Sequence, residues 1–302
     1  MYEETDEVQK VSTCAVSVVI GTYNRKRFLK KTIETLRDEL DSAPFKSEMI
    51  VVDGGSTDGT LNWLKKQKDT ITIIQHNRGK WHGKQIERRS WGYFMNLGFK
   101  CAQGKYICML SDDCLVVPGA IVNGYHLFEK ELEKGNNVGA VAFYWRNWPE
   151  MENYWIGYTL GGKLFVNHGM YLNSAVRRVD YIDEGFKFYF ADGDLCLKLC
   201  KAGYQTIPSE ESYIEHLSHA NRGVRRTNSM NNDLEWEKYL LKWKGIYYEE
   251  NGITGYFKEK QVPLHCKLTE EYWRFDGYIV KLRLMLESIA MRLIKRWQLM
   301  NN

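Results

Sequence analysis

The sequence lacks the cysteine patterns that mark zinc ribbons and disulfide frameworks. Its seven cysteines are scattered, mostly within apolar runs, and no two of them form a CxxC pair. Buried thiols in a reducing compartment are the better interpretation, which predicts a cytoplasmic protein. The chain also has no apolar run near the roughly 18 residues that span a bilayer, and its first ten residues are polar rather than signal-like. We therefore expect a soluble protein, or at most one that is peripheral to a membrane.

A large excess of charge of one sign is also missing. The chain has 42 basic and 38 acidic residues and a net charge of +4 at pH 7, which argues against a general nucleic-acid binder. Its 302 residues, of which 44% are hydrophobic, are enough to bury a full core. This size predicts one large α/β domain, alone or with an appendage.

Apolar runs and helical periodicity alternate along the first half of the chain. Four runs are short and nearly continuous, as expected of strands in a parallel sheet, and the first has the pattern of a strand buried on both faces. The segments between them carry apolar residues at helical spacing, which indicates a doubly wound α/β arrangement. The four predicted strands are Val16–Ile20, Met49–Val52, Ile71–Ile74 and Tyr106–Leu110.

The second half has a looser pattern, in which glycine and aromatic residues interrupt the periodicity. A linker that contains Pro263 separates it from the C-terminal stretch. The elements that we predict here are a strand over 138–145, a loop region over 146–171, a helix over 192–200, a short strand end over 213–216 and a helix over 233–243.

Polar side chains follow three of the predicted strands. The first ends at Thr22–Arg25 (TYNR), the second at Asp53, and the fourth at Asp112 and Asp113. Because the carboxyl ends of parallel strands share one edge of a sheet, we expect these residues to face one ligand-binding crevice. Adjacent carboxylates repel each other unless a cation neutralises them, and Mg²⁺ and Mn²⁺ favour such oxygen ligands and bridge to phosphates. Solvated turns after the strands are the alternative.

Four stretches of the chain resemble the successive signatures of family 2 glycosyltransferases with the GT-A fold. They read SVVIGTYNR, IVVDGGSTDGT, NLGFKCAQGKYICMLSDD and FADGDLCLKLCKAGY, and they occur in family order. The resemblance implies an α/β fold with a Rossmann-like, mostly parallel central sheet and a C-terminal helical extension. It divides the chain into a polar tail (1–15), a glycosyltransferase domain (16–245) and an extension with an amphipathic helix (246–302).

The resemblance also implies a nucleotide-sugar donor. The positions of Thr22, Tyr23 and Arg25 correspond to the loop that lines the nucleotide pocket. Asp53 corresponds to the residue that accepts a hydrogen bond from the base, most naturally from N3–H of uracil, which suggests a UDP-linked donor. Asp112 corresponds to a residue near the ribose.

Three further positions correspond to the metal site and the catalytic base of the family. Asp113 stands for the last Asp of the DxD motif and would bind Mn²⁺ or Mg²⁺, with His216 as a late metal or diphosphate ligand. Asp192 stands for the catalytic base. Asp194 and His219 remain open as alternatives to Asp192 and His216, and Asp192 could instead be only a helix N-cap.

The chain departs from the family pattern at several positions. Ser111 replaces the first Asp of DxD, Ala191 replaces the Glu that usually precedes the base, and Met95 replaces an Arg. An inserted stretch, GKWHGKQIERR, carries basic residues that could supply the lost positive charge: Lys80, Lys84, Arg88 and Arg89.

Together these residues predict a metal-dependent glycosyltransferase that acts on a glycan or lipid-linked acceptor. One carboxylate base without an enzyme nucleophile predicts inversion at the anomeric carbon. A non-catalytic nucleotide-sugar or glycan-binding relative remains open because Ala191 replaces an acid. A sugar nucleotidyltransferase is a further alternative, although GTYNR lacks the expected glycine-rich basic loop.

Residues 269–300 show helical amphipathicity. The predicted helix packs on the catalytic domain or on a second copy in a homodimer, or it lies on an anionic membrane where a lipid-linked acceptor would be met. Another face of this helix carries a mostly basic stripe, which consists of Arg274, Lys281, Ser288, Arg292 and Lys295. Arg296 lies beside Lys295 and adds to the basic residues at this end. The residues of the apolar face are Tyr272, Phe275, Ile279, Leu282, Leu286, Ile289, Leu293, Trp297 and Met300.

Overall fold

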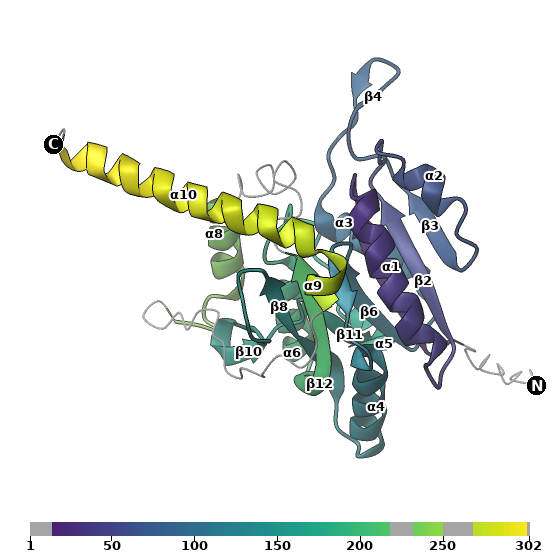
Figure 1. Cartoon of the computed structure of the whole chain (residues 1–302). Coiled ribbons are helices and arrows are strands. Elements are labelled where there is room, and N and C mark those ends of the chain that lie inside the picture. Colours follow the sequence, from purple (N-terminus) through teal and green to yellow (C-terminus); the bar gives the residue numbers. More distant parts are fainter. Residues whose placement is uncertain (1–13, 218–231, 250–267, 301–302) are drawn as a thin grey trace, which may run out of the picture.

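An eight-stranded mixed sheet forms the centre of the molecule in the computed structural model (Figure 1), which describes residues 14–217, 232–249 and 268–300, with backbone only for 295–300. Its strand order is β3-β2-β1-β6-β11-β8-β12-β7. The strands are β1 (Val16–Thr22), β2 (Ser47–Asp53), β3 (Thr70–Ile74), β6 (Tyr106–Ser111), β7 (Cys114–Val116), β8 (Val138–Trp148), β11 (Gly169–Leu172) and β12 (Gln205–Leu217). The expected α/β fold with a mostly parallel central sheet is confirmed.

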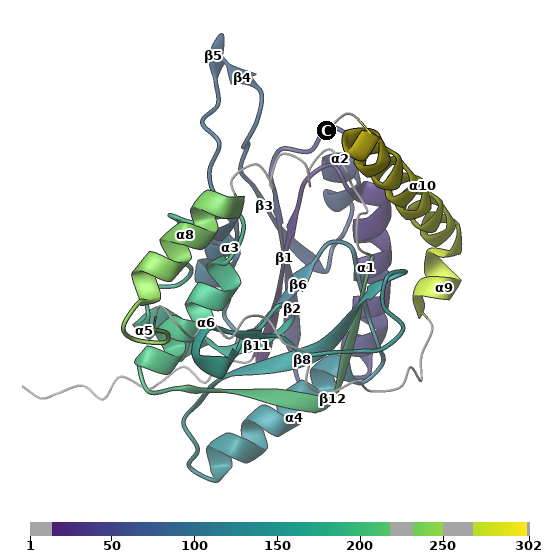
Figure 2. The ribbon, with the colours of Figure 1, turned by 90° about the vertical axis from the view of Figure 1, so that its left-hand side faces the viewer.

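Helices cover both faces of this sheet, and each face has its own apolar core (Figure 2). One core includes α1 (Lys26–Asp41), α2 (Thr60–Leu64) and α4 (Ala120–Glu133). The opposite core includes α3 (Trp91–Cys101), α5 (Asn173–Arg178), α6 (Ala191–Lys201) and α8 (Asn232–Trp243). Two small hairpins complete the body: β4 (Lys80–Trp81) with β5 (Lys84–Gln85), and β9 (Tyr158–Thr159) with β10 (Lys163–Leu164), the latter pair joined by the short helix η1 (Leu160–Gly162).

The register of the parallel strands brings their polar ends together. Thr22 at the end of β1 pairs with Asp53 at the end of β2. On the other side of β1, Gly21 pairs with Ser111, which directly precedes the two aspartates. The apolar runs of β1 and β6 are buried throughout, so a shift in register would expose core residues, whereas the edge strand β3 leaves Ile71 and Ile74 exposed. The polar groups that follow the three strands are therefore held at one edge.

The second half differs from the sequence prediction. Residues 169–172, expected within a loop region, form β11, which inserts antiparallel between β6 and β8. The predicted strand end over 213–216 is the last part of the 13-residue β12, whose irregular register near Ser209 interrupts the pattern. Local periodicity missed both because pairing with distant strands, rather than their own alternation, stabilises them.

The C-terminal helices attach to the body through a small separate cluster. Trp273 lies between α9 (Leu268–Tyr272) and α10 (Arg274–Met300) and packs with Leu115, Trp148 and Leu217. The ring of Phe28 in α1 meets Trp273 edge to face at 5.9 Å between centroids. We call the start of α10, which this cluster holds against the body, the root of the helix. Beyond the root, α10 extends away from the sheet (Figure 1).

The expected amphipathic helix is present in this C-terminal region. None of the described helices is both long and apolar enough to cross a bilayer. His219 and Pro263 lie outside the described residues.

Candidate functional site

A cleft of about 710 Å³ opens at the edge where the polar strand ends meet. Thr22, Tyr23 and Arg25 line it from the loop after β1, and Asp112 and Asp113 from the turn after β6. The other predicted site residues that line it are Asp192 and His216. Residues that are distant in the sequence thus share one cavity.

Arg25 bridges the two adjacent aspartates. Its Nη1 lies 2.8 Å from Asp112 Oδ1 and 2.7 Å from Asp113 Oδ2. Thr22 Oγ1 donates to the other oxygen of Asp112 at 2.7 Å. Both aspartates are buried, so the repulsion between them is offset by the guanidinium.

The two carboxyl groups differ in their acidity. Burial raises the pKa of Asp112, although Arg25 acts against this rise. Burial alone would also raise the pKa of Asp113, but Arg25 and His216 hold that pKa below its usual range. Asp113 is consequently the carboxylate of the pair that stays ionised most readily.

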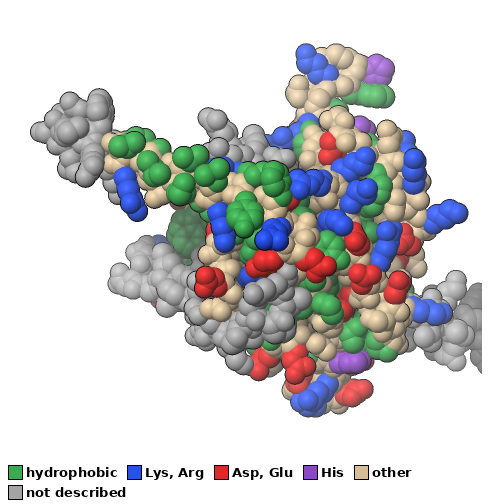
Figure 3. Space-filling view, viewed as in Figure 1, with side chains coloured by type: hydrophobic (Ala, Val, Ile, Leu, Met, Phe, Trp, Pro, Cys, Tyr) green, Lys and Arg blue, Asp and Glu red, His purple; other side chains and the backbone are tan. Residues whose placement is uncertain are grey.

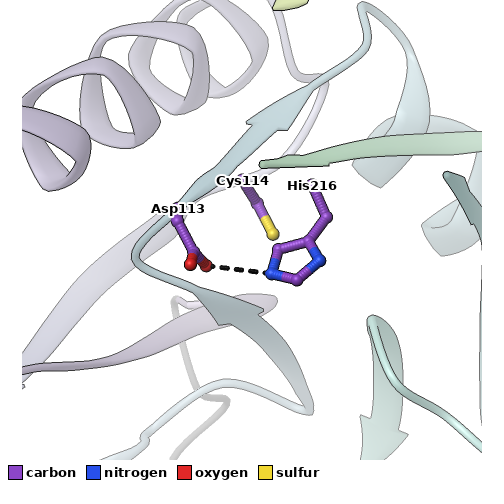
Figure 4. Close-up of side chains that lie close together, drawn as sticks. All are labelled: Asp113, Cys114 and His216. Atoms are coloured by element: carbon purple, nitrogen blue, oxygen red, sulfur yellow. Dashed lines mark ion pairs between the residues drawn. The ribbon is translucent and has the colours of Figure 1, made fainter. Parts of the chain in front are cut away.

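Asp113, from the turn before β7, and His216, from β12, approach each other (Figure 4). Asp113 Oδ1 lies 3.2 Å from His216 Nε2. Among the described residues, this oxygen of Asp113 makes no hydrogen bond of good geometry. His216 Nδ1 contacts Asn147 Oδ1 at 2.7 Å, which orients the ring with Nε2 toward the aspartate. The donor pair fits a divalent cation that retains further ligands from phosphate or water.

Cys114 completes a group of potential ligands within 4.8 Å of one another. Burial raises the pKa of its thiol far above the usual value, and the neighbouring aspartate acts in the same direction. A protonated thiol is a poor ligand for Mg²⁺ or Mn²⁺. We therefore regard Asp113 and His216 as the fitting pair.

Asp53 lies behind the cleft rather than in its lining. Its Oδ1 accepts hydrogen bonds from the backbone N–H groups of Gly55 and Ser56, both at 2.7 Å. Asp53 therefore has the turn-forming role that the sequence offered as the alternative to ligand binding. Its Oδ2, however, is buried and has no hydrogen-bond partner within the described parts of the chain. Its neighbours Val52 and Gly54 do line the cleft.

Basic side chains border the cleft near the loop after β1. Arg78 lies over the ring of Tyr23, with its Cζ 4.6 Å from the ring centroid. Arg88 and Arg89 from the inserted stretch also line the cleft, whereas Lys80 and Lys84 belong to the exposed β4–β5 hairpin. Met95, in the position of the family arginine, is buried and also lines the cleft.

The two aspartates at the start of α6 point in different directions. Residues two apart on a helix differ by about 200°, so they cannot share one face. Asp192 lines the cleft, is half-buried and accepts a hydrogen bond from Gly193 N–H at 2.8 Å. Asp194 is fully buried on the other side, with Lys242 Nζ at 2.8 Å and Trp243 Nε1 at 2.9 Å.

Burial raises the pKa of Asp192 to about 6. A carboxylate with that pKa is well matched to accept a proton near neutral pH. Asp192 is the second residue of α6, and its cap position is occupied by Phe190, so it is not the helix N-cap. The geometry favours Asp192 over Asp194 as the group that can meet a substrate.

Sequence analysis missed two residues beside this centre. Asn147, which orients His216, lies at the end of β8, where only a loop was expected. His168 is buried with its Nε2 3.5 Å from Cys114 Sγ, and burial lowers its pKa to about 3, so it is neutral. No local signal indicated either one, because strand pairing brings them there.

The comparison with known protein families agrees with this geometry. The model described as "Glycosyl transferase family 2" matches residues 17–186, more than half of the chain. The chain belongs to glycosyltransferase family 2. The resemblance and the transferase class expected from the sequence are thereby confirmed, and the strand-end residues of the cleft fall within the matched range up to Asp113.

Curated relatives of this family 2 glycosyltransferase match it at low to moderate identity. A chondroitin synthase of Pasteurella multocida is 28% identical over 127 residues, which cover 41% of this chain and 12% of that protein. The Escherichia coli UDP-Glc:alpha-D-GlcNAc-diphosphoundecaprenol beta-1,3-glucosyltransferase WfaP is 34% identical over 118 residues, 38% of this chain and 42% of that protein. The chain thus matches less than half the length of these two relatives.

A third relative matches over most of its length. A dolichyl N-acetyl-alpha-D-glucosaminyl phosphate 3-beta-D-2,3-diacetamido-2,3-dideoxy-beta-D-glucuronosyltransferase of Methanococcus voltae is 22% identical over 275 residues. This match covers 88% of the chain and 74% of that protein. This match extends the resemblance beyond residues 17–186, the range of the family match, to most of the family 2 glycosyltransferase.

Solved structures share its fold. S. aureus TarS (residues 1–349) has a TM-score of 0.53 at 14% identity, covering 78% of this chain and 67% of that one. The mannosyltransferase PcManGT from Pyrobaculum calidifontis, in complex with GDP-Man and Mn²⁺, has a TM-score of 0.54 at 18% identity with the same coverages. These likenesses support the GT-A architecture.

Proposed function

We propose that this glycosyltransferase transfers a sugar from a UDP-linked donor to an acceptor hydroxyl, with inversion and with the help of Mn²⁺ or Mg²⁺. The observation that carries the proposal is the cleft, where the loop after β1, the acidic pair and Asp192 line one cavity. Nucleotide, cation and base are the three components that such a transfer needs within reach of one another.

Asp53, Tyr23 and Arg78 support the nucleotide side of the proposal. The unpartnered Oδ2 of Asp53 can accept a hydrogen bond from the N3–H of uracil, which would satisfy a buried charged oxygen. Arg78 lies over the ring of Tyr23 at the cleft, and this pair offers a planar surface against which a base can pack. The relative WfaP is named for UDP-Glc, and TarS has been solved with UDP-GlcNAc.

Asp113 and His216 would hold the divalent cation. When bound, the ion supplies positive charge to the diphosphate as it leaves. Arg25 bridges the two aspartates, and its guanidinium is well placed to contact the same phosphates. The structural neighbour PcManGT was solved in complex with GDP-Man and Mn²⁺, which supports the proposal of a divalent cation.

Asp192 is the proposed general base. Its carboxylate takes the proton of the acceptor hydroxyl while that oxygen forms a bond to the anomeric carbon. The bond from that carbon to the nucleoside diphosphate breaks on the opposite face. The elevated pKa of about 6 keeps the residue basic enough to accept a proton and mostly ionised at neutral pH.

A lipid-linked acceptor is the proposed partner of the donor. The name of WfaP includes a diphosphoundecaprenol-linked sugar, and the name of the Methanococcus voltae relative includes a dolichyl-linked one. The amphipathic C-terminal helix, α10, also supports an acceptor at a membrane.

Release of nucleoside diphosphate from a panel of UDP- and GDP-sugars, with Mn²⁺ or with a chelator, tests the proposed function. We expect release from a UDP-sugar in Mn²⁺, loss of release in chelator, and an inverted anomeric configuration in the product by NMR. Asp113→Ala should lose the metal dependence, whereas Asp58→Ala, an exposed aspartate of the same sheet edge, should retain it. If donors bind but no nucleoside diphosphate is released from any of them, the non-catalytic binding protein that the replacement of an acid by Ala191 leaves open would be favoured.

A further inference from the structure

The outward side of α10 is covered by large apolar side chains. We call them the apolar face of α10, and each is between 46% and 68% exposed. Figure 3 shows hydrophobic side chains in a row along this helix. Met291 and Ile294 are exposed too, outside this face. The residues of the face are Phe275, Tyr278, Ile279, Leu282, Met285, Leu286, Ile289 and Leu293.

The opposite side of the helix is the one that contacts the body. Asp276 is buried and pairs with Arg27 of α1. Gly277 lies against the Trp148 ring so closely that an added Cβ would be 1.6 Å from it. Val280, one turn further, is 4% exposed. The sequence expectation that the apolar stripe packs on the catalytic domain is therefore wrong beyond the root: the helix uses its small and polar side for the body.

Basic residues accompany the apolar face. Arg274, Lys281 and Arg292 are exposed along one of its edges. In the sequence, residues 274–300 contain six basic residues (274, 281, 283, 292, 295, 296) and two acidic ones (276, 287), and of the latter Asp276 is buried against the body. Apolar residues flanked by cations are typical of helices that lie in the headgroup region of anionic bilayers.

The body adds a second basic group beside the root of α10. The first turns of α1 carry Lys26, Arg27, Lys30 and Lys31, and Lys31 Nζ lies 4.9 Å from the ring centroid of Tyr272. Figure 3 shows Lys and Arg side chains on the body next to the helix, with Asp and Glu side chains below them, on the face that also presents the apolar side chains of the helix. The basic side chains nearest the helix are complementary to a negatively charged surface.

A second copy of the chain fits these charges less well. If the apolar faces of two α10 helices met in antiparallel orientation, the edge with Arg274, Lys281 and Arg292 would lie along its own copy. Like charges at the edges of a helix pair repel and oppose association. The charge pattern therefore favours an anionic lipid surface over a homodimer.

We propose that α10 docks the enzyme on an anionic bilayer, with its apolar face among the acyl chains and its basic edge at the phosphates. The helix has 27 residues and is about 40 Å long, enough to lie in the bilayer plane over several headgroups.

The root of α10 connects directly to the cleft. Phe28 and Arg27, which hold the root, follow Arg25 of the cleft within three residues, and Trp148 follows Asn147. A buried network links the same parts: Arg146 pairs with Glu215 and with Glu270 of α9, each at 2.9 Å. Docking would hold the cleft next to the membrane, where, if the proposed function is right, a lipid-linked acceptor would enter it.

Flotation of the full-length protein with vesicles tests the proposal. We expect binding to phosphatidylcholine vesicles that contain about a third phosphatidylglycerol, weaker binding to pure phosphatidylcholine, and a decrease as salt rises. The double variant Leu282→Glu/Leu286→Glu places charge on the apolar face and should lower the partition coefficient more than about tenfold. Leu241→Glu is the matched control, because Leu241 is 78% exposed on α8, away from this face, and it should bind as the wild type does.

Three outcomes would overturn the proposal. The first is no binding of the wild type to anionic vesicles at low salt, and the second is an equal loss of vesicle binding in the Leu241→Glu control. The third is a wild-type dimer, seen by light scattering, that the double variant dissociates while vesicle binding is absent. The last result would assign the face to a second copy. Donor binding, measured by calorimetry without vesicles, is independent of docking. A failure of the membrane proposal is therefore distinguishable from a failure of the proposed transfer reaction.

Discussion

Replacement of Asp192 by Asn should separate catalysis from folding and from donor binding. The side chain lines the cleft and accepts a hydrogen bond from the N–H of Gly193, which an Asn oxygen can also accept. The change is nearly isosteric and removes only the ability to take a proton. We expect turnover to fall by about 10² to 10⁴, typical of the loss of a general base, while the dissociation constant of the donor stays nearly unchanged.

The pH profile provides the second readout. With a pKa of about 6, Asp192 is largely ionised at pH 7 and largely protonated at pH 5. Because the ionised form is the base, turnover should fall about tenfold between pH 7 and pH 5. The Asn variant should lack this inflection, since its residual activity does not depend on that proton.

Stability should change in the opposite direction to activity. A carboxyl whose pKa is higher in the folded state than in the unfolded chain binds more protons when folded, so stability falls as the pH rises from 3.8 through about 6. The full shift from 3.8 to about 6 corresponds to about 3 kcal/mol, and we discount it to about 1–2 kcal/mol because the side chain is only half-buried. Asp192→Asn should gain this free energy of unfolding at pH 7 and none at pH 3.

Steady-state kinetics, donor calorimetry and urea unfolding of the purified variant provide the assays. Asp194→Asn is the control: it removes the charge partner of Lys242 in the core and should lower stability while the folded enzyme keeps its pH inflection near 6. If Asp192→Asn keeps more than about a tenth of wild-type turnover, Asp192 is not the base. A loss confined to Asp194→Asn would assign that role two residues further along.

Three further predictions concern the metal, the buried network and the helix root. Asp113→Ala should abolish the Mn²⁺-dependent part of donor binding in calorimetry, with an unchanged circular dichroism spectrum; full binding in chelator would contradict the metal assignment. Arg146→Ala should leave the buried Glu215 without its cation and lower the free energy of unfolding by about 3–5 kcal/mol in urea, whereas a loss below about 1 kcal/mol would mean that the pair contributes little. Gly277→Ala should push α10 away from Trp148 and increase tryptic cleavage near residue 274, and an unchanged digestion pattern would show that the contact is not needed.

Several features of this protein followed from the sequence alone. The buried strands of the first half, and the acids that end them, were predictable because short apolar runs alternate there with segments of helical periodicity, and parallel strands end at one edge. The amphipathic C-terminal helix was equally clear from its periodicity. The four motifs in order predicted the family, which the family match confirms.

Tertiary structure alone decided which side chains act together. The choice between Asp192 and Asp194 depends on the rotation of α6 about its axis, which packing against α8 determines and local sequence does not encode. Likewise, Asn147 reaches His216 only because β8 and β12 pair over a long distance in the chain. The direction of the apolar face of α10 was undecided for the same reason: periodicity shows that a helix has an apolar side, but the contact of Gly277 with Trp148 turns that side toward the solvent.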